Sequence, residues 1–214
     1  MTSQTLNETC MEKVTNFYEG GRGLRSKDLK NYTSGDGTNP GMEDMVENLI
    51  WEVVHDLGID SGRVEITQKY FNPPDTETED PQRMDFHVKI DEKFPLIVES
   101  RAWIDKPFYT MKRAVTRNFM ELDYVREKLT DDVVFVYVSL ATAVKQRLVN
   151  TLDKTMGYGD RVKMCKLSPY PRGHKKGNYF DHGVHKEGVE QFINIISNQL
   201  SSYSDRKSVQ KEAA

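Results

Sequence analysis

Residues 83–101 place charged side chains in segments that otherwise resemble buried β-strands. Asp85 lies in a segment of alternating polar and apolar residues, and Glu99 and Arg101 end the apolar segment FPLIVESR. Glu99 and Arg101 are two residues apart, so both lie on the same face of a strand. An unpaired buried charge is costly, so this apolar strand predicts partners for its charges. Asp85, on the neighbouring strand, is the candidate that would lie opposite Glu99.

The side chains of Asp85, Glu99 and Arg101 together suggest metal-assisted chemistry on a phosphate. Two adjacent carboxylates repel each other, and a hard divalent cation between them relieves that repulsion. Such a cation activates water and stabilises the charge that builds on phosphorus, while a neighbouring cationic side chain holds the phosphate. The structural alternative is a salt bridge between Arg101 and one of the two acids at the end of a sheet.

A β-hairpin is predicted to position these residues. Apolar and polar residues alternate strictly over Arg83–Ile90, residues 91–93 form a polar connection, and Phe94–Arg101 form the second strand. A further strand is predicted at Val64–Phe71. The uninterrupted apolar run at 133–138 is typical of a central strand that is covered on both faces.

Helices are predicted on both sides of the hairpin in the sequence. Residues 42–57 carry an apolar stripe at helical spacing, and Gly58 ends this helix. Glu43 and Glu47 flank the stripe, either as solvated residues or as a further acid of the metal site. The other predicted helices are Leu6–Tyr18, Lys106–Leu129, Ala141–Met156 and Glu187–Tyr203, whereas residues 157–186 are expected to be irregular because they are rich in Gly, Pro, Lys, Arg, His and Tyr.

Length and composition indicate one soluble domain. The chain has 214 residues, of which 29% are charged and 37% hydrophobic, with a formal net charge of −3. This charge excludes a generally basic nucleic-acid coat, so any nucleic-acid binding must come from local patches. The two isolated cysteines suit a reducing cytoplasm. The sequence shows no signal peptide and no apolar stretch that could span a membrane, so we expect a cytoplasmic protein.

The predicted order helix, strand, strand, strand, helix, strand, with D…ExR on the second and third strands, resembles the PD-(D/E)xK nuclease superfamily, which includes type II restriction endonucleases. The resemblance implies an α/β fold with a restriction-endonuclease-like core, a mixed central sheet flanked by helices. It also implies Mg²⁺-dependent cleavage of double-stranded DNA by a homodimer. By this resemblance Asp85 and Glu99 bind the metal, Arg101 stands where the family usually has lysine, and Glu43 or Glu47 is the helix-borne acid.

The sequence departs from the family pattern in two ways. Met84 precedes Asp85, so the usual Pro-Asp dipeptide is absent. Arg101 stays protonated and cannot act as a general base, although it can bind phosphate and stabilise a transition state. Lys89, on the same strand face as Asp85, is a possible spatial replacement for the missing lysine.

We divide the chain into an N-terminal helix with a mobile basic arm (1–41), a catalytic core (42–140), C-terminal helices with DNA-contacting loops (141–204) and a tail (205–214). The predicted DNA-binding residues are Lys112, Arg113, Arg117, Arg172, Lys175 and Lys176.

The sequence is also compatible with three other functions. A repair or junction-resolving nuclease of the same fold would carry the same acids, and an inactive DNA-binding module would account for Arg101. A zinc-stabilised module is the third alternative, because four potential ligands lie close together in the sequence; they are Cys165, His174, His182 and His185.

Overall fold

The computed structural model describes residues 3–24, 28, 31–32, 41–71, 82–91, 93–101, 133–139, 161–167 and 183–204. These residues form three α-helices and one five-stranded sheet, which confirms the predicted α/β class. The helices are α1 (Gln4–Gly21), α3 (Met42–Asp56) and α6 (Lys186–Ser204), and a 3₁₀ turn, η1 (Ser61–Arg63), precedes the first strand. The strands are β1 (Val64–Phe71), β2 (Gln82–Ile90), β3 (Lys93–Arg101), β4 (Val134–Ser139) and β5 (Val162–Lys166).

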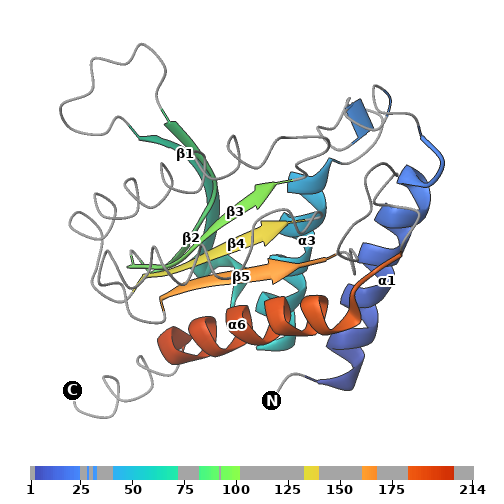
Figure 1. The fold of residues 1–214 in the computed structure, drawn as a ribbon. Helices are drawn as coiled ribbons and strands as arrows, with labels where there is room; N and C mark the ends of the chain where they lie inside the picture. Colours follow the sequence, from blue (N-terminus) through green and yellow to red (C-terminus); the bar gives the residue numbers. More distant parts are fainter. Residues whose placement is uncertain are drawn as a thin grey trace, which may run out of the picture.

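The sheet is mixed, and its strands follow the order β1-β2-β3-β4-β5. β1, β2 and β3 pair antiparallel, whereas β4 is parallel to β3 and β5 is parallel to β4. The arrowheads of β3, β4 and β5 therefore point the same way (Figure 1). Each parallel pair needs a connection that returns to the starting end of the sheet. The helices predicted at 106–129 and 141–156 belong to these two connections and lie outside the described residues.

One face of the sheet packs against the helices. α3 contacts α1, α6 and β3, and α6 also contacts β3 and β5, beside which it runs in Figure 1. The apolar stripe of α3 supplies Leu49 and Val53 to the shared core, and alternate residues of β2 and β3, such as Phe86 and Val98, point into it. This period-2 alternation explains why the intervening residue Asp85 and its neighbour Glu99 lie on the other face.

The second face of the sheet is shielded from solvent at β4 and at the adjoining parts of β2 and β3. Phe135 and Tyr137 of β4 are 1% exposed on this face, and Val136 and Val138 are buried on the helical face. The prediction of a central strand that is covered on both faces is therefore confirmed for β4. On this face of β2, the polar residues Asp85 and His87 are buried as well.

The hairpin turn is anchored by an ion pair. Asp91 has a φ of 46°, in the left-handed region that Asp tolerates better than most residues. Nη2 of Arg63 lies 2.6 Å from Oδ2 of Asp91, and Nε lies 3.2 Å from both carboxylate oxygens. These bonds raise the pKa of the Arg63 guanidinium. The turn between β2 and β3 is thereby tied to the start of β1.

Most predicted elements agree with the structure, and one prediction was wrong. The helices at α1, α3 and α6 and the strands β1 to β4 occur where the sequence places them, although α1 is longer than the predicted Leu6–Tyr18. Residues 157–186, however, are not irregular throughout, because Val162–Lys166 form β5. A strand of five residues between glycine-rich and charged segments gives little periodicity, and its pairing with β4 is a non-local contact.

Candidate functional site

Asp85 and Glu99 lie together where the backbone ladder between β2 and β3 ends. The paired residues at this end are Phe86 and Val98, and the acids lie one position beyond them on each strand. The backbone N–H of Asp85 donates to Oε2 of Glu99 at 3.2 Å. At this position a side-chain carboxylate, not a backbone carbonyl, accepts the hydrogen bond from the strand. The two acids lie next to each other in the fold, as predicted.

Ser100 holds the carboxylate of Asp85 from the opposite strand. Its backbone N–H lies 2.7 Å from Oδ2 of Asp85, and its Oγ lies 2.8 Å from the same oxygen. Both distances are typical of strong hydrogen bonds to an ionised acceptor. In the sequence, Ser100 is only the residue between Glu99 and Arg101 of the ExR motif. The only available signal was that the spacer is a residue with a hydroxyl donor.

Both acids are removed from solvent. Asp85 is 2% exposed and Glu99 is 0% exposed. His87, two residues from Asp85 on the same face, is 0% exposed, and Tyr137 lies in register beside Glu99 on β4. Two ionised carboxylates on adjacent strands repel each other, and their burial removes the water that would screen the two charges. A cation between the acids would offset this repulsion.

The remaining predicted catalytic residues are placed only in part. Arg101 is in β3, in register with Ser139 of β4, and its side chain lies outside the described part of the chain. Glu43 is half-buried in the first turn of α3. Glu47 accepts a hydrogen bond from Nε1 of Trp51 at 3.4 Å. The role of Glu43 or Glu47 in metal binding stays a prediction.

Lys89 has a different environment from Asp85. Its Nζ lies 3.3 Å from Oε2 of Glu65 on β1, near the hairpin turn. Because Lys89 and Asp85 are separated by four residues along β2, they lie more than 10 Å apart along the strand at about 3.3 Å per residue. The observed ion pair with Glu65 gives Lys89 a structural role in the β1–β2 pair.

The potential zinc ligand Cys165 belongs to the hydrophobic core beneath α6. Burial raises the pKa of its thiol to about 12, which disfavours the thiolate that zinc requires. His185 contacts Glu187, with 3.5 Å between Nε2 and Oε2. His174 and His182 lie outside the described residues.

The predicted DNA-binding side chains also lie outside the described residues, and their roles stay predictions. They are Lys112, Arg113, Arg117, Arg172, Lys175 and Lys176. None of the helices in the described ranges is long and apolar enough to cross a membrane.

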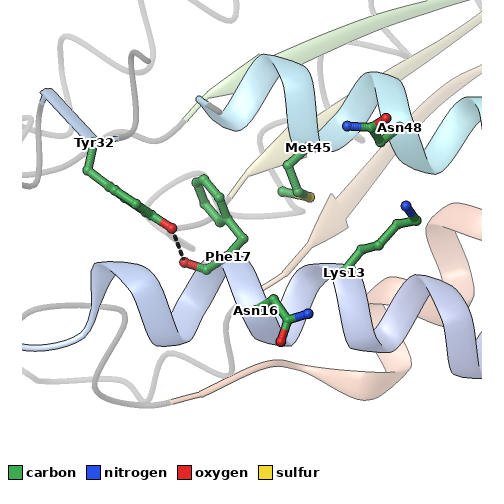
Figure 2. Close-up of a pocket in the computed structure, with 6 residues that line it drawn as sticks. All are labelled: Lys13, Asn16, Phe17, Tyr32, Met45 and Asn48. Carbon is green, nitrogen blue, oxygen red and sulfur yellow. Dashed lines mark hydrogen bonds between the residues drawn. The ribbon is translucent and has the colours of Figure 1, made fainter. Parts of the chain in front are cut away.

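A separate cavity of about 260 Å³ lies between α1 and α3. Its described lining residues come from both helices and from Tyr32, whose hydroxyl donates to the carbonyl of Phe17 at 2.8 Å (Figure 2). The rings of Phe17 and Tyr32 stack with centroids 5.2 Å apart. Lys13 at its edge is paired with Glu52 at 3.2 Å. No acid is among the described lining residues, so this cavity is distinct from the carboxylate pair.

The donor set at the carboxylate pair fits a hard cation. Among the described residues, His, Cys, Asp and Glu side chains do not gather in any group of three or more that could hold a metal. Mg²⁺ does not need such a group, because it is usually held by one or two carboxylates and completes its shell with water and substrate phosphate oxygens. The two oxygen-donor side chains of Asp85 and Glu99 therefore suit Mg²⁺ better than zinc, which prefers nitrogen and sulfur ligands.

Comparisons of the sequence with protein-family models and with curated proteins gave no match.

Proposed function

We propose that this protein is a Mg²⁺-dependent endonuclease that cleaves double-stranded DNA at a short specific sequence. The observation that carries the proposal is the buried pair of Asp85 and Glu99 at the point where the β2–β3 ladder ends. Burying two like charges side by side is costly, and a divalent cation between them would offset that cost. The pair therefore supports a bound cation and the chemistry that it permits.

Each residue of the pair has a defined task in this proposal. Asp85 and Glu99 bind the cation and fix its position relative to the end of β3. When bound, Mg²⁺ supplies an activated water and neutralises the charge that develops on the phosphate. Arg101 follows on the same strand and binds a non-bridging phosphate oxygen through its planar guanidinium, in place of the family's lysine.

The element order supports the finer fold assignment. An acidic helix precedes three antiparallel strands, the acids lie on the second and third of these strands, and parallel strands follow. This is the arrangement expected for a restriction-endonuclease-like core. We further propose that two chains act as a homodimer, because a two-fold symmetric enzyme can cut both strands of a palindromic site.

The test is digestion of a sequenced supercoiled plasmid in Mg²⁺ and in chelator. The wild-type chain should give discrete fragments with Mg²⁺ and none with chelator. Asp85→Asn should lower the cleavage rate at least about a hundredfold. The substituted amide keeps a carbonyl oxygen for the two donors of Ser100, so the fold should persist. Glu65→Gln, which neutralises an exposed acid of the same sheet, is the control and should cut normally.

Other results would point elsewhere. A smear, or a preference for branched DNA, would replace sequence-specific cleavage with a repair or junction-resolving activity. Specific binding with no cleavage in Mg²⁺ or Mn²⁺ would indicate an inactive binding module. Near-normal cleavage by Asp85→Asn would refute the assignment of the site.

A further inference from the structure

We infer that Ser100 is a positioning residue that restricts Asp85 to metal binding through a single oxygen, and so makes the site select Mg²⁺ over Ca²⁺. This inference rests on the proposed metal-dependent function. It assigns a role to a residue that the motif itself treats as a spacer. It is carried by the hydrogen bonds between β3 and the carboxylate of Asp85.

Two hydrogen-bond donors occupy one carboxylate oxygen of Asp85. Each carboxylate oxygen has two lone-pair sites. The backbone N–H and the Oγ of Ser100 both donate to Oδ2, at 2.7 and 2.8 Å. Oδ2 is therefore saturated by donors from the same residue, and a cation would bind Asp85 through Oδ1.

The same two donors hold the carboxylate of Asp85 against rotation. A single hydrogen bond would let the group turn about its Cβ–Cγ bond, whereas two donors on one oxygen, both fixed to β3, hold its plane. Ser100 is 4% exposed, so water does not readily replace its hydroxyl. The opposite strand donates in return, because the N–H of Asp85 bonds Oε2 of Glu99 at 3.2 Å. Each acid is thus oriented by the backbone of the strand that faces it.

A carboxylate held in this way suits Mg²⁺ better than Ca²⁺. Mg²⁺ requires nearly ideal octahedral geometry at about 2.0–2.1 Å and takes carboxylates through one oxygen, whereas Ca²⁺ accepts six to eight ligands and often binds both oxygens of a carboxylate. A carboxylate held to one-oxygen binding suits the smaller ion. Ca²⁺ would lose the second carboxylate oxygen that it often takes as a ligand. Ser100 thereby contributes to selectivity without contacting the metal through its side chain.

The experiment follows metal binding to the full chain without DNA. Melting temperatures are measured at increasing MgCl₂ or CaCl₂ at constant ionic strength. A ligand that binds only the folded state stabilises it by RT ln(1 + [L]/Kd), so the dependence of Tm on metal concentration gives the Kd. Ser100→Ala should raise the Kd for Mg²⁺ about tenfold, the lower end of the range for losing a residue that orients a metal ligand. The Kd for Ca²⁺ should stay the same or fall.

Two further variants keep the result interpretable. Ser197→Ala removes a hydroxyl from another buried serine, 7% exposed on α6, and should leave both metal titrations as in the wild type. Ser100→Thr retains the hydroxyl donor and should restore most of the Mg²⁺ response. The same variants are then compared by the Mg²⁺ concentration at half-maximal DNA cleavage, which should follow the same order.

The outcomes separate this inference from the proposed function. Wild-type protein that responds to Mg²⁺ and cuts DNA, with Ser100→Ala titrating identically, would overturn the role of Ser100 and leave the nuclease proposal standing. Equal weakening for Mg²⁺ and Ca²⁺ would overturn the selectivity. A wild-type chain that neither responds to either metal nor cuts DNA would overturn the proposed function itself, and this inference with it.

Discussion

Glu99→Gln in the absence of metal distinguishes a metal-binding acid from a structural one. If Glu99 is present for a cation, the metal-free protein carries the repulsion between two adjacent buried carboxylates. Neutralising one of them should then stabilise the fold. If Glu99 instead serves as the salt-bridge partner of Arg101, the same substitution breaks a buried ion pair and should destabilise the fold.

The expected magnitude follows from the strand geometry. Residues opposite each other on antiparallel strands have Cβ atoms about 5 Å apart. Two unit charges roughly 6 Å apart repel by about 3 kcal/mol at an effective dielectric constant of about 20. The substituted amide still offers a carbonyl oxygen to the N–H of Asp85, but the hydrogen bond loses its charge assistance, at a cost of about 1 kcal/mol. We therefore expect a net stabilisation of about 1–2 kcal/mol.

The assay is thermal unfolding in chelator and in excess Mg²⁺. For a chain of this size, 1 kcal/mol corresponds to about 2–4 °C in Tm, so Glu99→Gln should melt about 2–8 °C above the wild type in chelator. At tenfold excess of Mg²⁺ over its Kd the wild type should gain about 1.4 kcal/mol, and the variant much less. Glu65→Gln removes the charge of an exposed acid that pairs with Lys89, and it should change stability by less than about 1 kcal/mol in both conditions.

The refuting result is a fall in Tm in chelator. Removing one partner of a buried ion pair typically costs about 3–5 kcal/mol. A loss of that size for Glu99→Gln, without any change in the Mg²⁺ response, would mean that Glu99 supports the fold through a salt bridge. Repulsion between the two carboxylates would then not govern the stability of the metal-free fold.

Three further predictions concern other residues. Burial raises the pKa of the Cys165 thiol from 9.0 to about 12. The unfolded chain therefore loses this proton at a lower pH than the folded protein, and stability should fall between pH 9 and 12. The plot of stability against pH for Cys165→Ala should be flatter in this range than that of the wild type. Gly188→Ala should lower the free energy of unfolding in chemical denaturation by at least about 2 kcal/mol, because the new Cβ would overlap the carbonyl of Lys166 at the end of β5. Gly62→Ala has room for a methyl group and should lower it by less than about 1 kcal/mol. Arg101→Lys should keep part of the single-turnover cleavage rate. Arg101→Ala should lower that rate at least about a hundredfold with little change in Tm. A large drop in Tm with a nearly normal rate would instead indicate a structural salt bridge.

The sequence alone determined most of the local structure around the candidate site. Polar and apolar residues alternate strictly over 83–90, and β3 begins with an apolar run; these two features predicted the hairpin. The alternation is informative because successive side chains of a strand point to opposite faces in any tertiary context. The same alternation placed Glu99 and Asp85 on one face of adjacent strands. The apolar stripe of α3 and the uninterrupted run of β4 likewise carry their burial pattern in the residues themselves.

Tertiary structure alone decided the features that depend on non-local contacts. The strand β5 forms because it can pair in parallel with β4. Its five residues, of mixed type, give no local signal of this pairing. The burial of Asp85 and His87 could not be read from an alternating strand, since that pattern usually means one face in solvent. The role of Ser100 depends on the end of the β2–β3 ladder, where its two donors meet one oxygen of Asp85. Residue types fixed which groups could do chemistry, and the register between strands decided which of them meet.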